Sequence, residues 1–205
     1  MLTVTPILIV VAAYLAGSIP VGVIVGRLMG FDPRAVGSGN IGMTNVARVA
    51  GRGAATLTFI GDFLKGALPV LIVRSMGFDT TILALTALAA FIGAISSIFL
   101  RFRGGRGVST SLGIWFVLAP EAIILSLTVF LVFVAMTRIV SLGSIAGSIS
   151  FPPIVAALGY PRPYILLAIV MVAFILLRHW ENVLRIVNGD EPRLGARVNH
   201  QSPQS

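Results

Sequence analysis

Long apolar runs are the feature that most restricts what this chain can fold into. Several stretches carry almost no charged residue, and a helix needs about 20 apolar residues to cross a bilayer. Only helices and closed barrels satisfy their backbone hydrogen bonds in lipid, and these runs lack the alternating pattern of barrel strands. Charged residues make up 11% of the chain, against about 25% in soluble domains. We therefore expect an all-α, polytopic membrane protein.

The apolar runs predict seven transmembrane helices. They cover about 4–28, 54–75, 81–100, two short spans within 109–137 on either side of a Pro-Glu pair, 145–158 and 164–177. So many spans leave no room for a separate soluble domain. We expect residues 1–205 to form one membrane domain, with a polar tail from about 185.

The distribution of arginine predicts the orientation in the membrane. Every arginine except Arg74 and Arg162 falls on one side of this topology, and positively charged loops stay in the cytoplasm. The N-terminus is then outside, the C-terminus is cytoplasmic, and the protein lies in the cytoplasmic (inner) membrane. The net charge of +8 sits between spans, which favours anionic lipid and phosphorylated substrates over nucleic acid. Because the chain has no cysteine, disulfides and thiolate catalysis are excluded.

A polar, glycine-rich segment between the first two spans, 37–48, is the strongest candidate for a binding site. Its hydrogen-bonding side chains are Ser38, Asn40, Thr44 and Asn45, and it ends in Arg48. Glycines let a backbone approach a ligand closely, and a guanidinium can hold a phosphate through two bonds. The alternative is a flexible loop that ends in a helix cap.

A second segment, 103–110, combines three glycines with Arg106 and a Ser-Thr pair. Backbone N–H groups, a fixed positive charge and a helix N-terminus together suit an oxyanion. The spacing is not that of a Walker loop. The alternative is a basic membrane anchor followed by a helix cap.

Two shorter motifs and one charged pair complete the candidates. Ser141 and Ser144 stand at a predicted helix start, where capping is the alternative. His179 and Asn182 are three residues apart, so on a continuing helix they share a face; solvation or capping is the alternative. Charges near a span indicate function, although Asp62 and Lys65 are also spaced for a local ion pair.

Motifs for a strong nucleophile are missing. The sequence contains no G-x-S-x-G elbow, no H-E-x-x-H motif and no carboxylate pair. An enzyme of this kind needs a substrate that is already activated, and contributes positioning and charge stabilisation.

Together these segments resemble the bacterial acyl-phosphate:glycerol-3-phosphate acyltransferases, the PlsY family. The matching motifs, in the family's order, are GSGNIGxTNxxR at 37–48, DxxKG at 62–66, GGxGVxT at 104–110, SLxS at 141–144 and HxxN at 179–182. The resemblance implies a seven-helix membrane enzyme of phospholipid synthesis that transfers an acyl group from acyl phosphate to glycerol 3-phosphate and releases phosphate. We expect no cofactor, and no cluster of ligands in the sequence suggests a metal.

By matching positions, the resemblance also assigns residues. The catalytic set is Ser38, Asn40, Arg48, Arg106 and His179. The substrate-binding set is Gly37, Gly39, Thr44, Asn45, Lys65, Gly104, Gly105, Gly107, Thr110, Ser141, Ser144 and Asn182. Among all these residues, Arg106, Thr110 and backbone N–H groups near 104–107 are expected to hold a phosphate. The attacking group is the substrate's own hydroxyl, and its base is open between a substrate phosphate and His179.

Two positions depart from the family's usual pattern. Arg106 stands where lysine is usual, and Ala94 stands where the segment before it usually has histidine. A guanidinium keeps the charge but cannot act as a general acid. A catalytically weakened relative therefore remains an alternative to the acyltransferase. A transporter for a phosphorylated or anionic solute is another, since it would use the same basic groups for binding.

Overall fold

The computed structural model describes residues 4–195, and these form helices and no strands. The elements in chain order are α1 (Val4–Ser18), α2 (Val21–Leu28), α3 (Met43–Ser75), α4 (Thr80–Ile95), the 3-10 turn η1 (Ile98–Leu100), α5 (Val108–Leu118), α6 (Pro120–Thr137), α7 (Val140–Ala157), α8 (Arg162–Arg178) and α9 (Trp180–Val187). The end of the expected polar tail, 196–205, lies outside the described residues.

Most of these helices are long and apolar enough to cross a bilayer. Five stretches qualify by length and composition within 4–195, and the bent pair α8 and α9 adds a sixth if it counts as one span. The chain turns at Pro120, where the split between two short spans is expected. However, α5 has 11 residues, or about 16 Å at 1.5 Å per residue, against a hydrocarbon core of about 30 Å. The all-helical membrane fold is confirmed, whereas the count of seven spans stays a prediction.

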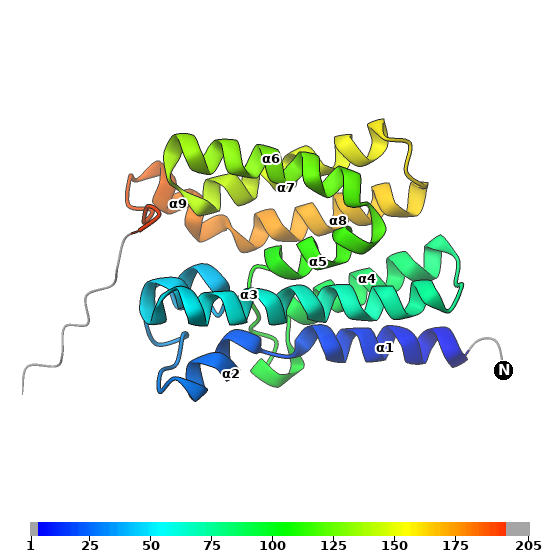
Figure 1. The fold of residues 1–205 in the computed structure, drawn as a ribbon, viewed down its shortest axis with the longest axis horizontal. Coiled ribbons are helices and arrows are strands. Elements are labelled where there is room, and N and C mark those ends of the chain that lie inside the picture. The colour runs from blue at the N-terminus through cyan, green and yellow to red at the C-terminus, as the bar shows by residue number, and fades with distance from the viewer. Residues whose placement is uncertain (1–3, 196–205) are drawn as a thin grey trace, which may run out of the picture.

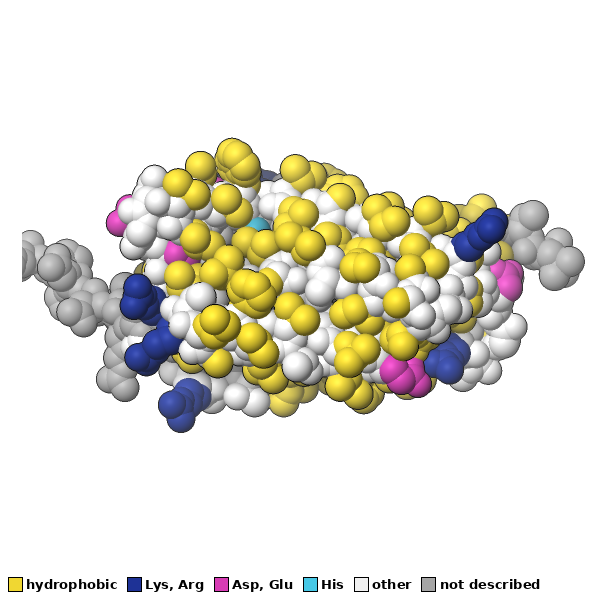
Figure 2. Space-filling view, turned by 90° about the horizontal axis from the view of Figure 1, so that it is seen from above, with side chains coloured by type: hydrophobic (Ala, Val, Ile, Leu, Met, Phe, Trp, Pro, Cys, Tyr) yellow, Lys and Arg dark blue, Asp and Glu magenta, His cyan; other side chains and the backbone are white. Residues whose placement is uncertain are grey.

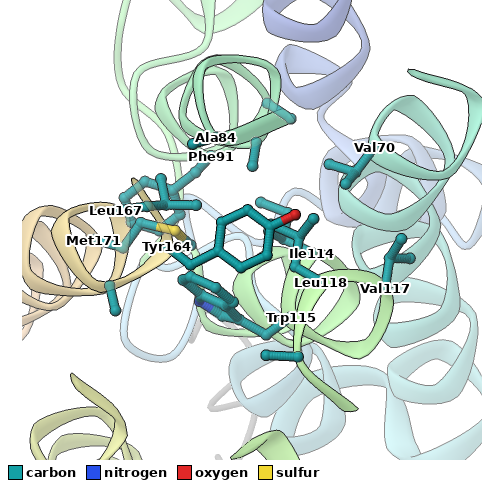
Figure 3. Packing of buried hydrophobic residues seen from close by; sticks show 14 of the residues in the cluster. Val70, Ala84, Phe91, Ile114, Trp115, Val117, Leu118, Tyr164, Leu167 and Met171 are labelled. Atoms are coloured by element: carbon teal, nitrogen blue, oxygen red, sulfur yellow. The ribbon is translucent and has the colours of Figure 1, made fainter. Parts of the chain in front are cut away.

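The helices pack as an elongated bundle with α5 near its middle (Figure 1). In that view α1, α3 and α4 lie on one side of α5, and α6, α7 and α8 lie on the other. The largest fully buried side chains are Phe91 of α4, Ile114 and Trp115 of α5, and Met171 of α8. Figure 3 shows the side chains of α5 and α8 meeting here, with the ring of Tyr164 beside Trp115. The short helix α5 is therefore the centre of the apolar core.

The surface also suits a membrane. Hydrophobic side chains spread along the length of the face seen in Figure 2, while Lys, Arg, Asp and Glu lie near its two ends. Large apolar side chains such as Leu8, Ile124 and Leu166 are more than half exposed. Exposed apolar surface on this scale belongs in lipid, because monomeric soluble proteins rarely show large contiguous apolar patches.

Three boundaries differ from those expected. The second span was predicted from about 54, but α3 begins at Met43 and continues through a non-helical Gly51. The first span is interrupted between α1 and α2, where Pro20 supplies no N–H. The last span does not run on through the histidine motif: α9 is bent by 54° from α8. Polar segments expected as loops therefore begin or end helices next to the site.

Candidate active site

A cavity of about 340 Å³ lies within this bundle and collects residues from every polar segment. Its lining includes these residues expected at the site: Ser38, Asn40, Thr44, Asn45, Arg48, Lys65, Gly105, Arg106, Gly107, Thr110, Ser141, Ser144 and His179. Gly37, Gly39, Gly104 and Asn182 were also expected there but do not line it. Segments separated by more than a hundred residues thus share one cavity.

Asn45 organises the glycine-rich segment at the start of α3. Its side-chain oxygen accepts from the Ser38 N–H at 2.8 Å, and its amide donates to the carbonyls of Pro33, Val36 and Asn40 at 2.9 to 3.1 Å. The close approach requires glycine at 37, where φ is +63° and a Cβ would lie 2.2 Å from this side-chain oxygen. The side-chain amide of Asn45 therefore holds the loop in shape. Glycine at 37 allows this side chain to lie so close to the backbone.

In the second glycine-rich segment, 103–110, two backbone N–H groups that were expected to bind phosphate bond to the protein instead. Gly104 N–H donates to the Ile95 carbonyl at 3.2 Å, and Gly105 N–H donates to the Ala94 carbonyl at 3.0 Å. The expectation that these two groups hold a phosphate is therefore wrong, because the free carbonyls at the C-terminus of α4 already engage them. The N–H groups left for an anion are those that follow, where α5 begins after Gly107.

Gly107 itself shapes the start of α5. Its φ is +80°, and a Cβ there would lie 2.5 Å from the ring of Phe91. A side chain would be strained at this φ and would also clash with the core. The glycine therefore lets the first turn of α5 lie directly against α4 at the cavity.

Arg178, which the sequence analysis left without a site role, fixes the other side of this segment. Its Nε donates to the Gly105 carbonyl at 3.1 Å, and its Nη2 donates to the Gly104 carbonyl at 2.6 Å. Charge-assisted hydrogen bonds of this kind are stronger than neutral ones. Arg178 thus joins the end of α8 to the loop that presents Arg106.

We expect Arg178→Ala to lower kcat/KM by about tenfold or more, since small misplacements of a catalytic loop cost up to about a hundredfold. The measurement is steady-state turnover in detergent or nanodiscs. Arg138→Ala is the matched control, because that exposed arginine makes no side-chain hydrogen bond among residues 4–195. Equal activity of the two variants would contradict the proposed clamp.

Arg106 is the most desolvated arginine of the site. Burial is the main cause that lowers its pKa to about 10, and Arg185 and Arg48 add repulsion against the attraction of Glu191. The guanidinium therefore stays charged at neutral pH. Its Nε is buried without a hydrogen-bond partner among the described residues. A buried cationic donor without a partner is costly, and an anionic ligand in the cavity would satisfy it.

Glu191 is the site residue that sequence reasoning missed. Its carboxylate, 7% exposed, accepts hydrogen bonds from Ser141 Oγ at 2.7 Å, Asn182 Nδ2 at 2.6 Å and Arg185 Nε at 2.7 Å. Desolvation raises the pKa of Glu191, but hydrogen bonds from Ser141, Arg185 and Asn182 outweigh it, so the net shift is downward. The carboxylate is therefore ionised at neutral pH and joins the serine and histidine motifs.

The residues that follow Glu191 are held against two other parts of the chain. Arg48 Nη2 donates to the Pro192 carbonyl at 3.3 Å, and the Leu194 N–H donates to the Arg138 carbonyl at 2.6 Å. Within the polar tail expected from about 185, Glu191 lines the cavity, and Arg185 and Pro192 bond to residues that line it. The sequence signal was weak, since Glu191 stands beside Asp190 in a polar stretch that also carries arginines.

The remaining motif residues lie on the α7 and α8 side. His179 is 2% exposed, and its Nδ1 lies 2.8 Å from the Ile175 carbonyl. A carbonyl can only accept, so Nδ1 carries the hydrogen and Nε2 is the ring nitrogen with a free lone pair when the ring is neutral. Asn182 is 1% exposed, and its side-chain oxygen has no partner among the described residues.

The charged pair in α3 is engaged internally. Lys65 Nζ lies 2.8 Å from the Asp62 carboxylate and donates to the Ile19 carbonyl at 3.0 Å. That carbonyl lies at the break between α1 and α2. Lys65 lines the cavity, but of its three donors one holds the interrupted helix at Ile19 and another pairs with Asp62.

The cavity has an apolar region beside its polar end. The apolar side chains that line it include Phe59, Trp115, Ile123, Leu127, Phe130, Phe151 and Met171. Trp115 and Phe151 pack with ring centroids 4.6 Å apart. Among residues 4–195, no cluster of three His, Cys, Asp or Glu side chains could hold a metal ion. The arrangement can hold a molecule with an anionic head and a hydrocarbon chain.

Known proteins match most of this chain. A family model described as glycerol-3-phosphate acyltransferase matches residues 7–189. A glycerol-3-phosphate acyltransferase of Rubrobacter xylanophilus is 43% identical over 191 residues, which cover 93% of this chain and 96% of the relative. One of Geobacter sulfurreducens is 41% identical over 190 residues, covering 93% and 98%.

Two solved structures also match. The crystal structure of PlsY (YgiH), an integral membrane glycerol 3-phosphate acyltransferase, has a TM-score of 0.89 in its glycerol 3-phosphate form, with 42% identity and coverage of 93% of this chain and 96% of that chain. The lysophosphatidic acid form has a TM-score of 0.87, 41% identity and coverage of 94% and 96%.

Proposed function

This chain belongs to the glycerol-3-phosphate acyltransferase family, and we propose the following reaction for its cavity. As an acyltransferase of phospholipid synthesis, it transfers an acyl group to glycerol 3-phosphate. The donor is an acyl phosphate, and the products are 1-acylglycerol 3-phosphate and inorganic phosphate. One observation carries this proposal: Arg48 and Arg106 share a cavity with a large apolar lining.

Glycerol 3-phosphate occupies the polar end of the cavity. A solved relative is described in its glycerol 3-phosphate form, which supports this ligand. Arg48 holds its phosphate. Asn182 does not line the cavity and acts through Glu191, whose carboxylate accepts from the Asn182 amide at 2.6 Å. Ser144 Oγ donates to the Val140 carbonyl at 3.0 Å, so its lone pairs can accept a hydrogen bond from a hydroxyl of the glycerol phosphate.

The acyl phosphate places its phosphate at Arg106 and the first turn of α5, and its chain among the apolar side chains. The substrate hydroxyl attacks the acyl carbon and forms the new C–O ester bond. The bond from the acyl carbon to the phosphate oxygen breaks, and its electron pair leaves with phosphate. Arg106 stabilises that charge. The hydroxyl proton passes to the departing phosphate or to Nε2 of His179.

We also propose the finer features of the fold. Residues 1–205 form one acyltransferase domain with seven membrane-embedded helices, in which α5 enters the bilayer only partly. The N-terminus is outside and the C-terminus inside, with the cavity opening to the cytoplasmic side of the inner membrane. The support is the distribution of arginine, since Arg74 and Arg162 stand apart from all the others.

The donor is tested with purified protein in nanodiscs. With palmitoyl phosphate and glycerol 3-phosphate we expect lysophosphatidate and one phosphate per acyl group transferred, because the mixed anhydride is already activated. With palmitoyl coenzyme A or palmitoyl acyl carrier protein we expect no turnover, since the cavity offers no strong nucleophile to attack a thioester. Transfer from either thioester at a comparable rate would overturn the choice of donor.

The same preparation also tests the two alternative functions, a catalytically weakened relative and a transporter. A folded protein without turnover on any donor would favour a weakened relative. Uptake of labelled glycerol 3-phosphate into proteoliposomes without a donor would favour a transporter. No observation on the cavity supports transport, because its polar groups gather at one end instead of near the midplane.

A further inference from the structure

The short helix α9 carries an apolar stripe on the face that points away from the site. Trp180, Leu184 and Val187 are 63%, 46% and 78% exposed. Their spacing of four and three residues places them on one face of a helix. Asn182, on the other face, is 1% exposed and bonded to Glu191. The helix therefore has one side in the protein and one apolar side without a described partner.

The stripe continues the membrane-facing surface of α8. Leu166, Ile169 and Leu177 of α8 are 64%, 52% and 70% exposed. At the end of α8 the chain bends by 54° into α9. A helix that leaves a span at such an angle turns toward the plane of the bilayer surface. Tryptophan is enriched at that depth, where its ring is apolar and its N–H remains hydrated.

From this geometry we infer that α9 is an interfacial helix whose apolar stripe inserts into the lipid surface beside the active site. The occupant of the stripe is lipid, because the stripe is continuous with the lipid-facing side of α8. A protein partner is disfavoured by size: α9 has eight residues, whereas a stable interface buries about 800 Å² on each partner. Amphipathic helices with this division of faces lie at the boundary of headgroups and acyl chains.

The insertion has a consequence for catalysis, which rests on the proposed function. The opposite face of α9 supplies Asn182 and Arg185 to the carboxylate of Glu191. The next residue, Pro192, accepts from Arg48. Lipid that holds α9 in place therefore holds the glycerol phosphate end of the cavity, and Trp180, Leu184 and Val187 act as positioning residues.

Insertion is tested by site-directed spin labelling, for which the absence of cysteine provides a clean background. Single variants Leu184→Cys, Val187→Cys and Glu181→Cys are labelled in lipid nanodiscs. We expect labels at 184 and 187 to collide with oxygen and to be shielded from a water-soluble nickel chelate, and the label at 181 to behave oppositely. Nickel access at all three positions, or spin–spin broadening from a second copy, would overturn the proposal.

The catalytic consequence is tested with Val187→Glu, which places a charge in the stripe and touches no residue of the cavity. We expect KM for glycerol 3-phosphate to rise about tenfold while KM for palmitoyl phosphate stays within about twofold. Val187→Leu is the matched control and should behave as the wild type. Unchanged kinetics of Val187→Glu would refute the coupling, whereas an inactive wild type would refute the proposed function and leave the labelling result standing.

Discussion

Arg106→Ala is expected to lower kcat/KM by roughly a hundredfold to a thousandfold, the range for loss of one preorganised donor to a developing anion. The arginine is half-buried just before the start of α5, and its buried Nε has no partner among the described residues. This donor is therefore available to form a hydrogen bond with an anionic ligand. The loss should appear mainly in kcat, because the charge on the leaving phosphate grows toward the transition state.

Two further variants make this result specific. Arg103→Ala removes a cation from the same segment at an exposed position and should change kcat/KM by less than about threefold, as rim charges do. Arg106→Lys keeps the charge but loses the planar fork, and we expect activity between that of the wild type and that of the alanine variant. Equal losses at Arg103 and Arg106 would mean that only the net charge of the loop matters.

The second large effect is expected at Glu191. Glu191→Ala leaves the buried Ser141 and Asn182 donors without their acceptor, at about 1–3 kcal/mol for each such group. A loss of about 3 kcal/mol corresponds to a fall in Tm of roughly 10 °C for a chain of this size. We expect this fall in detergent together with a strong loss of glycerol phosphate binding. Thermal unfolding and isothermal titration with glycerol 3-phosphate provide the two measurements.

The neighbouring carboxylate provides a control for Glu191. Asp190→Asn changes the charge by the same amount at an exposed position and should shift stability by no more than about 0.5 kcal/mol. If Glu191→Ala unfolds too readily to be assayed, Glu191→Gln retains one acceptor and allows binding to be measured. Wild-type Tm and binding in both Glu191 variants would contradict the role given to the carboxylate.

The charge of Glu191 also predicts a pH dependence of the same measurement. The hydrogen bonds of its carboxylate lower its pKa in the folded protein below the ordinary value of 4.5. The folded state therefore binds this proton less readily than the unfolded state, and the stabilisation is present above pH 4.5. It is lost as the pH falls through the folded pKa. The gap in Tm between the wild type and Glu191→Gln should accordingly narrow below pH 4.5.

Much of the site could be predicted from local patterns in the sequence. Arg48, Arg106, Ser144 and His179 were expected together, and they line one cavity. These residues stand in short polar motifs between apolar runs, and a bundle of spans brings the ends of its helices together. The roles of individual backbone groups were harder to predict. The Gly104 and Gly105 N–H groups were assigned to a phosphate, but α4 takes them.

The bend at the end of α8 could not be predicted from the sequence, for a related reason. The motif of His179 and Asn182 has the spacing of one continuing face, yet the chain bends between α8 and α9. Glu191 looked like part of a solvated tail because its neighbours are polar. Its partners Ser141, Asn182 and Arg185 come from two other elements, and no local pattern records which distant donor a carboxylate meets.

The sequence alone determined the environment of each segment. Hydropathy is a sum over neighbouring residues, so it separates the parts of the chain that lipid accepts from those it excludes, and the motifs between them indicate anion chemistry. The tertiary structure alone decided the pairing of polar groups. A buried carbonyl, amide or carboxylate takes whichever partner the packed helices bring within about 3 Å, and that choice depends on the whole bundle.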